Sequence, residues 1–322
     1  MIYDTIIIGS GPAGVAAAIY AARREMKTII LTKDLGGQLA LASTIENYPG
    51  FESIDSFELT QKMHNHVKSL GVEIRINEVK KIEKQDDKTF KLFTEKEELT
   101  ARTIILTMGL APRRLAIPGE EQYSGKGVSY CSTCDGPFYK KKIVAVVGGG
   151  NSALDAAEVL SKIAEKVYLI HRQNEFRGFE ALIKKVNETQ NIEIILNSQV
   201  KEITGNVLVE KIKVTNNDSN EERTIDINGI FIEAGRVAHT DLVADLCDRN
   251  EKKEILVDEK CNTKTPGLFA AGDVTQVPFK QISIATGQAT IAALAAYQYL
   301  QLKEGKTPGI LLDRSPVRKQ VV

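Results

Sequence analysis

Glycine-rich turns between an apolar strand and an alanine-rich helix constrain this chain more than any other feature, and it has two of them. The first follows the predicted strand Thr5–Ile8, where Gly9, Gly11 and Gly14 form the pattern GxGxxG. Gly9 allows the tight turn, Gly11 lets the backbone approach a pyrophosphate, and Gly14 lets the helix pack closely on the strand. Free N–H groups at the start of that helix suit phosphate oxygens. The pattern therefore predicts a dinucleotide site.

The second glycine turn repeats this arrangement in the middle of the chain. The predicted strand Ile143–Val147 runs into a glycine triplet that begins at Gly148, and Ala153 takes the third position of the pattern. An amphipathic helix and a further strand, Val167–Ile170, complete a βαβ unit. Two dinucleotide sites in one chain are far more specific than one. The simple interpretation is that one holds a flavin and the other a nicotinamide nucleotide, so that hydride passes between them.

The residues at the end of each second strand help to tell the two sites apart. An acid there binds the ribose 2′-hydroxyl of NAD, whereas arginine accommodates the 2′-phosphate of NADP. The second site ends in His171, Arg172 and Arg177, which favours NADP over the alternative of a solvated basic turn. The first site ends in Thr32, with Asp34 as the nearby acid, and this stretch alone does not distinguish NAD from FAD.

A third element favours FAD at the first site. The segment TPGLFAAGDV is a short apolar strand that ends in Gly272 and Asp273, and the next helix is expected to begin near Gln281. An acid at the carboxyl end of a sheet strand suits a ribityl hydroxyl, and the positive end of the helix would stabilise anionic reduced flavin. The alternative is an Asp273 that merely caps a helix.

The segment YCSTCDGPFYKKK, just before the second glycine turn, carries the CxxC pair Cys131 and Cys134. Such a pair can be a metal clip, a structural disulfide or a redox centre. Zinc needs a second pair of ligands, which neither Cys247 and Cys261 nor the histidines provide. Because the cysteines are too few for a secreted disulfide scaffold, a redox pair is the favoured interpretation. Cys247 and Cys261 are expected to be unreactive packing residues.

Charge and hydropathy restrict the partners of the chain. Its 42 basic and 42 acidic side chains balance, so no overall field attracts nucleic acid or an anionic membrane. The longest apolar stretches are too short to span a bilayer, and the N-terminus runs straight into a strand without a basic leader. We therefore expect no nucleic-acid partner and no membrane partner. The small number of cysteines and the lack of a second ligand pair also lead us to expect a cytoplasmic protein with no metal.

The order of these motifs resembles that of the low-molecular-weight thioredoxin reductases, which are FAD-dependent pyridine nucleotide-disulfide oxidoreductases. The segments that carry the resemblance are, in order, GSGPAG, GGQL, ENYPGF, CSTCDGPFY, GGGNSA, HR…FR and PGLFAAGDV. The resemblance implies an α/β fold of two doubly wound Rossmann-like domains, with the NADP domain inserted into a discontinuous FAD domain. The FAD-binding domain is expected at 1–113 and 245–322, and the NAD(P)-binding domain with the CxxC at 114–244. Enzymes of this family are homodimers.

The resemblance also implies an activity, in which electrons pass from NADPH through FAD and the Cys131–Cys134 dithiol to the disulfide of thioredoxin or a similar small protein. Cys134 is expected to stack on the flavin, Cys131 to attack the partner's disulfide, and Asp135 to protonate the departing thiolate. In the family, rotation of the NADP domain presents the nicotinamide and the dithiol to the flavin in turn. The implied FAD contacts are Gly9, Gly11, Pro12, Ala13, Gly14, Thr32, Gly37, Gln38, Leu39, Asn47, Gly272, Asp273, Lys280, Gln281 and Ile282. The implied NADP contacts are Gly148, Gly150, Asn151, Ser152, Ala153, His171, Arg172 and Arg177.

Some positions depart from the family's pattern. Gln173 replaces the second arginine of the motif HRR, so NADH or reduced ferredoxin as the electron donor is an open alternative. Ala238 and His239 replace the usual residues of a hinge motif, and Pro137 takes the first aromatic position after CxxCD. A flavin redox sensor that does not turn over is the non-enzymatic alternative.

Three further regions carry expectations. The chain is expected to cross between the domains near the segments APRRLAIPGEEQY and EAGRVAHTDL, whose breakers and polar residues suit hinges. His64 and His66 are expected to be exposed on a surface helix of the flavin domain. Residues 304–322 are expected to form a polar tail after the last helix.

Overall fold

The computed structural model describes residues 1–41 and 44–306, which form two compact units. Unit 1 comprises Met1–Ala40, Glu46–Gly109 and the chain from Ala238 onward, and unit 2 comprises Leu41–Ile45 and Leu110–Val237. The boundaries predicted from the sequence, 113/114 and 244/245, lie a few residues further along the chain. Of the predicted tail 304–322, residues 307–322 lie outside the described part.

A seven-stranded sheet forms the centre of unit 1, in the order β5-β2-β1-β8-β7-β6 with β19 also paired to β8. Strands β5, β2, β1, β8 and β19 are parallel, and β7 and β6 join in antiparallel fashion. Strand β8 accepts both β7 and β19 because β7 pairs with its first half and β19 with its second half. The strands are β1 Ile2–Ser10, β2 Thr28–Leu35, β5 Glu73–Ile76, β6 Val79–Lys84, β7 Phe90–Thr94, β8 Glu98–Leu106 and β19 Leu268–Ala270.

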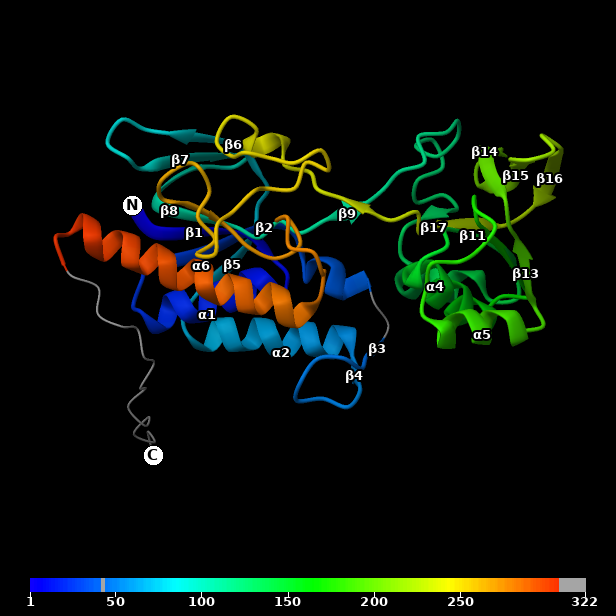
Figure 1. Ribbon diagram of the computed structural model, residues 1–322, viewed down its shortest axis with the longest axis horizontal. Helices are drawn as coiled ribbons and strands as arrows, with labels where there is room; N and C mark the ends of the chain where they lie inside the picture. Colours follow the sequence, from blue (N-terminus) through cyan, green and yellow to red (C-terminus); the bar gives the residue numbers. More distant parts are fainter. Residues whose placement is uncertain (42–43, 307–322) are drawn as a thin grey trace. The chain divides into compact units, whose positions relative to one another are not determined.

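Both faces of this sheet are buried, because successive apolar residues of a strand point to opposite sides. Ile7 of β1 packs against α1 Pro12–Arg23 and α6 Ile282–Lys303, whereas Ile6 faces the opposite core. Alanines line the contact between α1 and α6, which lets the two helices approach closely; they are Ala17, Ala18, Ala21, Ala289, Ala292, Ala293 and Ala296. Figure 1 shows α1, α6 and α2 Ser56–Ser69 on one side of the sheet and β6 and β7 toward the other.

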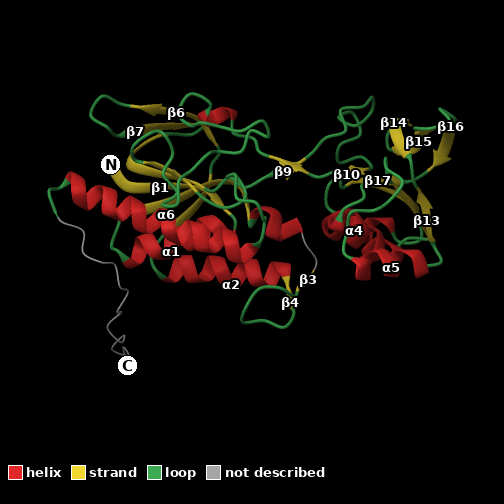
Figure 2. Cartoon of the chain, in the orientation of Figure 1, coloured by secondary structure: helices red, strands yellow, loops and turns green. Residues whose placement is uncertain are grey.

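Unit 2 is built on a five-stranded, all-parallel sheet in the order β10-β17-β11-β12-β13. Helices α4 Asn151–Ser161 and α5 Glu180–Glu188 cover one face of it, and a three-stranded antiparallel sheet, β14-β15-β16, packs on the other (Figure 2). A short helix, α3 Ser132–Asp135, follows β10. The strands are β10 Val128–Ser129, β11 Ile143–Val147, β12 Lys166–Ile170, β13 Ile192–Ile195, β14 Ser198–Gly205, β15 Val209–Asn216, β16 Glu222–Asp226 and β17 Gly229–Ile232.

The two segments predicted as domain crossings lie side by side. Strand β9 Ala111–Pro112 pairs in antiparallel fashion with β18 Arg236–Val237, and the remaining short strands are β3 Thr44–Ile45 and β4 Ile54–Asp55. The parallel sheets confirm the predicted α/β class, and the predicted strand at Ile143–Val147 is confirmed residue for residue. Within residues 1–41 and 44–306, no helix is both long and apolar enough to cross a membrane.

Candidate active site

The first glycine turn joins β1 to α1, and its glycines are required for different structural reasons. Gly9 has a φ of +112°, and a Cβ on Gly14 would lie only 1.9 Å from the carbonyl oxygen of Gly9. Gly9 is therefore required by its backbone conformation, and Gly14 is required because helix and strand pack closely there. Gly11 differs, since the nearest atom to its Cβ position is the carbonyl oxygen of Gly36 at 3.6 Å. The turn thus leaves open space in front of the helix, where a Cβ would intrude on a bound pyrophosphate rather than on the fold.

Segments distant in the sequence approach this turn through their own glycines. A Cβ on Gly37 would lie 3.7 Å from Cα of Gly11, so the GGQL segment borders the open space. Gly272 has a φ of +79°, and its Cβ position is 3.0 Å from Cβ of Ala13. The GD motif that follows β19 therefore lies against the first turn of α1.

Two side-chain hydrogen bonds join these segments further. The Gln38 amide donates to the Asp273 carboxylate at 2.9 Å, across 235 positions of the sequence. The Asn47 amide donates to the side-chain oxygen of Gln281 at 3.1 Å. Gln281 is the N-cap of α6, which begins at Ile282 as predicted. All of the predicted FAD contacts lie in unit 1, and these bonds bring its amino-terminal and carboxyl-terminal motifs together.

Two further predicted FAD contacts, Thr32 and Lys280, also form hydrogen bonds or ion pairs within the protein. The buried Thr32 hydroxyl donates to the carbonyl oxygen of Asp34 at 2.5 Å, and Asp34 is exposed. The Lys280 ammonium donates to the carbonyl oxygen of Asp273 at 3.1 Å and pairs with Glu254 at 2.9 Å. Lys280 thereby holds the loop that carries Asp273, and a contact of Thr32 or Lys280 with FAD stays a prediction.

Sequence reasoning missed two polar residues beside this turn. The prediction that His64 is exposed is wrong, because it is buried and its Nε2 lies 2.9 Å from the carbonyl oxygen of Ser10; His66 is exposed. The side-chain oxygen of Gln288 accepts a hydrogen bond from the N–H of Gly272 at 2.9 Å and so supports the GD motif. The only sequence signal for His64 is its spacing: Ser56, Thr60 and His64 recur every four residues along one stripe of α2, but three polar residues do not indicate that the stripe is buried.

The second glycine turn joins β11 to α4 in unit 2. Gly148 has a φ of +153°, and a Cβ there would lie 2.2 Å from the carbonyl oxygen of Glu233. A Cβ on Gly149 would lie 2.2 Å from the His171 ring, whereas no atom of the described residues lies within 4 Å of the Cβ position of Gly150. Gly150 is the N-cap of α4 and receives no side-chain capping bond. The second turn therefore has the same open position as the first, and Asn151, Ser152 and Ala153 form the first turn of its helix.

The basic turn after β12 separates into a buried part and an exposed part. His171 is buried under the glycine turn and stacks on Phe176, with ring centroids 5.7 Å apart, and its burial lowers the pKa of the imidazole. Arg172 and Arg177 are exposed, and neither guanidinium forms an ion pair among the described residues. The N–H of Arg177 donates to the carbonyl oxygen of Gly149 at 2.7 Å, which draws this basic turn back onto the glycine turn.

A polar cavity of about 510 Å³ opens beside this turn. Among the residues that the structure describes, no acid lines this cavity, so its charge suits an anion. Its lining residues are Arg172, Gln173, Gln199, Lys201, Thr215, Asn216, Asn217 and Asn220.

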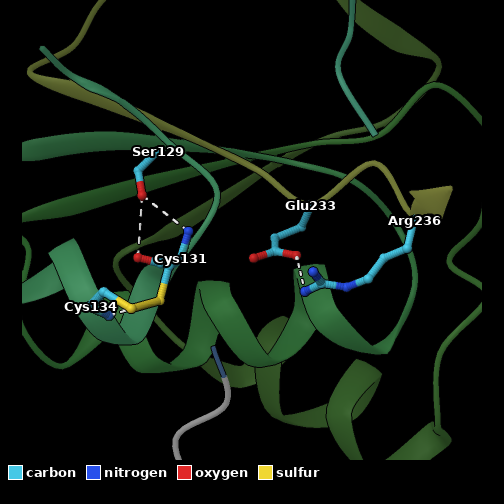
Figure 3. Close-up of a disulfide and its surroundings, with 5 residues drawn as sticks. All are labelled: Ser129, Cys131, Cys134, Glu233 and Arg236. Atoms are coloured by element: carbon cyan, nitrogen blue, oxygen red, sulfur yellow. Dashed lines mark hydrogen bonds and ion pairs between the residues drawn. A yellow bond between two sulfur atoms is a disulfide. The ribbon is translucent and has the colours of Figure 1, made fainter. Parts of the chain in front are cut away.

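The CxxC pair forms a disulfide at the start of α3, directly after β10 (Figure 3). The Cα atoms of Cys131 and Cys134 are 5.4 Å apart. The Cys131 sulfur accepts a hydrogen bond from the N–H of Cys134 at 3.0 Å, and the N–H of Cys131 donates to the Ser129 hydroxyl oxygen at 3.1 Å. Cys131 is 7% exposed and Cys134 is exposed. The N–H of Asp135 donates to the carbonyl oxygen of Cys131 at 3.2 Å, which continues the turn.

A buried acid anchors the loop that leads to this disulfide. Glu120 is 3% exposed, and its carboxylate accepts hydrogen bonds from the N–H groups of Leu115 at 2.9 Å and Ala116 at 2.6 Å. The Tyr130 hydroxyl, next to Cys131, donates to the same carboxylate at 2.7 Å. Burial and this carboxylate raise the pKa of Tyr130, so the phenol stays a donor. Glu120 therefore connects the crossing loop to the residue before the disulfide.

The other two cysteines lie away from this chemistry. Cys247 and Cys261 are each 2% exposed in the two cores of unit 1, as predicted for packing residues. Burial raises the pKa of each thiol to about 11, so both stay protonated near neutral pH. Among the described residues, no group of His, Cys, Asp and Glu side chains could hold a metal ion.

Known proteins resemble this arrangement over nearly the whole chain. Residues 3–289 match the family model described as pyridine nucleotide-disulphide oxidoreductase. A thioredoxin reductase of Listeria innocua serovar 6a is 38% identical over 307 residues, which cover 94% of this chain and 96% of that protein. The crystal structure of the thioredoxin reductase of Lactococcus lactis has a TM-score of 0.88 and 39% identity, over 92% of this chain and 99% of that one. An NADH dehydrogenase of Bacillus subtilis (strain 168) is 36% identical over 300 residues, 92% of this chain, but the chain spans only 58% of its length.

The chain belongs to the pyridine nucleotide-disulphide oxidoreductase family. Within it, the chain groups with the low-molecular-weight thioredoxin reductases, which confirms the resemblance drawn from the motifs. Membership implies FAD and a nicotinamide cofactor. The open positions at Gly11 and Gly150 fit such groups, because a backbone without side chains there can approach a pyrophosphate.

Removal of the Glu120 carboxylate should destabilise the protein. We expect Glu120→Ala to lower the free energy of unfolding by roughly 2–4 kcal/mol, because two backbone N–H groups and the Tyr130 hydroxyl lose their acceptor. The measurement is denaturant unfolding of the cofactor-loaded protein. Glu121→Ala is the matched control, since that side chain is 91% exposed and its loss should cost under about 0.5 kcal/mol. Equal losses for the two variants would contradict the anchoring role of Glu120.

Proposed function

We propose that this protein is an NADPH-dependent thioredoxin-disulfide reductase, in which electrons pass through FAD and the Cys131–Cys134 pair to the disulfide of thioredoxin or a similar small protein. The observation that carries the proposal is a CxxC disulfide at the end of β10, in the same parallel sheet whose strand β11 leads into the second glycine turn. A disulfide beside a nucleotide turn, in a chain that has a second such turn in its other unit, supports transfer of electrons from a nucleotide to a thiol pair.

In this proposal the first glycine turn holds FAD and the second holds the nicotinamide nucleotide. Bound FAD would supply the ability to take hydride from the nicotinamide and to pass an electron pair to the disulfide. Support for FAD in unit 1 comes from the hydrogen bonds that join Gln38 to Asp273 and Asn47 to Gln281, since an FAD site needs motifs from both ends of the chain. The N-terminus of α6 after Gln281 would favour a negative charge on the ring of the reduced cofactor.

The dithiol step follows ordinary thiol–disulfide exchange. After reduction, the Cys131 thiolate attacks one sulfur of the partner's disulfide, forms a mixed disulfide and expels the other sulfur as a thiolate, which Asp135 protonates. Cys134 then attacks the Cys131 sulfur, releases the second partner thiolate and re-forms the Cys131–Cys134 disulfide. The N–H of Cys134, 3.0 Å from the Cys131 sulfur, supports this assignment because a donor at that distance stabilises a thiolate.

The choice of NADPH over NADH rests on the basic turn. Arg172 and Arg177 are exposed, the adjoining cavity contains Lys201, and no acid lines it. A 2′-phosphate would find cations there that the uncharged 2′-hydroxyl of NADH cannot use. Gln173 supplies no charge, so the preference depends on these remaining side chains.

The proposal includes a homodimer in the cytoplasm, with thioredoxin or a thioredoxin-like protein as the partner. The thioredoxin reductases of Listeria innocua and Lactococcus lactis support this partner, because the chain matches nearly their full lengths. Steady-state reduction of thioredoxin by NADPH tests the function as a whole. NADPH oxidation that does not depend on thioredoxin would contradict it.

The two open glycine positions should separate the two cofactors. Gly11→Leu should abolish retention of FAD, because the side chain would occupy the space next to the pyrophosphate. Gly150→Leu should keep FAD but lose NADPH binding for the same reason at the other turn. Flavin absorbance per chain and NADP⁺ binding to the oxidised protein are the measurements. Each variant serves as the control for the other, and normal flavin content in Gly11→Leu would contradict the assignment of the first turn.

Arg177 should discriminate NADPH from NADH. Loss of a charge-assisted contact with the 2′-phosphate typically costs ~1.5–3 kcal/mol, so Arg177→Ala should lower kcat/KM for NADPH roughly tenfold or more. The value for NADH should change little, because NADH has no 2′-phosphate. Arg114→Ala, at another exposed arginine of unit 2, is the control. Equal losses with both nucleotides would show that the basic turn does not recognise the phosphate.

The two cysteines should differ in role. In Cys131→Ser, the remaining Cys134 thiolate should give a charge-transfer absorbance with oxidised FAD. In Cys134→Ser, the band should be absent, and Cys131 should form a mixed disulfide with a thioredoxin that lacks its resolving cysteine. Both variants should still allow NADPH to bleach the flavin, and both should fail to turn over thioredoxin.

The two sulfurs differ in their exposure to solvent, so the test distinguishes between two possible assignments of their roles. Cys134 is exposed and Cys131 is buried in the disulfide form, so the opposite assignment has its own physical support. A mixed disulfide on Cys134 in the Cys131→Ser protein would reverse the roles. Substantial thioredoxin turnover by Cys131→Ser would contradict the dithiol mechanism altogether.

A further inference from the structure

Glu233 lies at the carboxyl end of strand β17 in unit 2, and the neighbouring strands β10 and β11 lead to the disulfide and to the second glycine turn. It is the first residue after β17, and its N–H donates to the carbonyl oxygen of Val147, the last residue of β11, at 2.8 Å. On the other side, Ser129 of β10 is in register with Phe231 of β17. Three neighbouring parallel strands thus end, in order, in the CxxC segment, Glu233 and the glycine turn. Ligands of open α/β sheets bind beyond the carboxyl ends of such strands.

The Glu233 side chain is largely covered by protein but has poor partners. Its side chain is 10% exposed, and Arg236 lies 3.9 Å away, with the two side chains facing one another in Figure 3. Nη1 of Arg236 is itself buried and has no hydrogen-bond partner among the described residues. Burial raises the pKa of Glu233 to about 7, against the opposing charge of Arg236 and with a smaller contribution in the same direction from the charge of Asp155 on α4. Buried polar groups normally have close partners, so this pair has unused hydrogen-bonding capacity at the sheet edge.

The direction of a bound dinucleotide indicates what would use that capacity. Its pyrophosphate belongs at the glycine turn after β11, and its adenosine half belongs at the end of β12, where Arg172 lies. The nicotinamide half must therefore extend the other way, over the end of β17 and toward β10. Its ribose hydroxyls and carboxamide N–H groups are donors that a carboxylate accepts, and its carboxamide oxygen is an acceptor for a guanidinium.

We propose that Glu233, together with Arg236, binds the nicotinamide–ribose half of the nucleotide, with the ionised Glu233 carboxylate accepting hydrogen bonds from that half. The inference rests on the proposed function, because it assumes that the second glycine turn binds NADP. The positively charged ring of NADP⁺ gains more from the carboxylate than the neutral ring of NADPH does. Nucleotide affinity is therefore coupled to the ionisation of Glu233, and the charged groups that set this ionisation are Arg236 of β18 and Asp155 of α4.

The test measures NADP⁺ binding to the oxidised, FAD-loaded protein by calorimetry at pH 6 and pH 8. Glu233→Gln should bind NADP⁺ about tenfold more weakly than wild type at pH 8, because a charge-assisted acceptor is lost. At pH 6 the wild-type carboxyl is largely neutral, so the difference should shrink to about twofold or less. The phosphates of the nucleotide titrate equally in both measurements, so the ratio of the two dissociation constants isolates Glu233. Glu210→Gln, the same change at an exposed site of β15, should match wild type at both pH values.

A fragment of the nucleotide separates failure of the inference from failure of the proposed function. The adenosine half alone, 2′,5′-ADP, should bind wild type and Glu233→Gln equally. Equal NADP⁺ affinity of the two proteins at pH 8, with 2′,5′-ADP binding intact, would overturn the role of Glu233. Absence of 2′,5′-ADP binding to wild type would instead overturn the nucleotide assignment of the second glycine turn.

A second variant keeps the proposal testable if Glu233→Gln does not fold. Arg236 lowers the pKa of Glu233, so Arg236→Gln should raise the pH at which NADP⁺ affinity increases. If NADP⁺ affinity increases at the same pH in Arg236→Gln as in wild type, the proposed coupling between nucleotide affinity and the ionisation of Glu233 is contradicted. If Glu233→Gln alters the rate of thiol–disulfide exchange but leaves NADP⁺ affinity unchanged, Glu233 serves the disulfide and the proposal is wrong.

Discussion

The close approach of backbone to backbone at the two strand–helix turns is the constraint on which both candidate sites depend. At the first turn, a Cβ on Gly14 would lie 1.9 Å from a carbonyl oxygen, and at the second, a Cβ on Gly148 would lie 2.2 Å from another. A side chain at Gly14 would push the helix away from its strand, and one at Gly148 would collide with the backbone that follows β17. The middle positions, Gly11 and Gly150, are free of such contacts. Packing among the described residues gives no reason for a glycine at either position, so a bound ligand explains the two glycines better than the fold does.

Sheet topology then determines which distant segments reach the first turn. Strand β8 lies between β1 and β19, and all three are parallel, so their carboxyl ends share one edge. The GD motif after β19 consequently arrives beside the start of α1, although more than half of the chain separates the two. The hydrogen bond between Gln38 and Asp273 is a result of this arrangement, and so is the support that Gln288 gives to Gly272. The three-residue strand β19 is therefore enough to bring Gly272 and Asp273 beside the first glycine turn, because it pairs with β8.

Much of this architecture follows from the sequence, and the exceptions have physical causes. The apolar run Ile143–Val147 predicts its strand because a parallel strand buried on both faces needs no alternation. Strand β14 lacks a regular alternation, because a register shift after Val200 puts Val200 and Ile203, three residues apart, into the same core. His64 was misjudged because a polar residue on a buried helix stripe resembles one on a surface face. Local pattern cannot reveal a partner such as the carbonyl oxygen of Ser10.

The candidate site was predictable to the extent that its chemistry resides in short motifs. The CxxC and the glycine turns are such motifs, and the resemblance to a known family supplied the residues between them. Glu120 and Glu233 do not belong to such motifs, because each is a single acid whose role depends on how the fold buries it. Glu120 has three donors on its carboxylate, whereas Glu233 has one arginine at 3.9 Å. The same residue type is thus an anchor in one place and an unfilled acceptor in the other.

The contrast between these two acids bears on how the sheet edge of unit 2 works. Strands are spaced about 4.8 Å apart, so the ends of β10 and β11, with β17 between them, are about 10 Å apart. An acid whose pKa rises from 4.5 to about 7 on folding lowers stability as pH rises through that interval, by up to about 3 kcal/mol above neutral pH. The sign follows from proton binding, because the folded state holds a proton that the unfolded chain has already released. A ligand that donates hydrogen bonds to the carboxylate would recover part of this free energy on binding. In the proposed nucleotide site, the free energy that burial of Glu233 costs in the free protein would contribute to nucleotide affinity and to its dependence on pH.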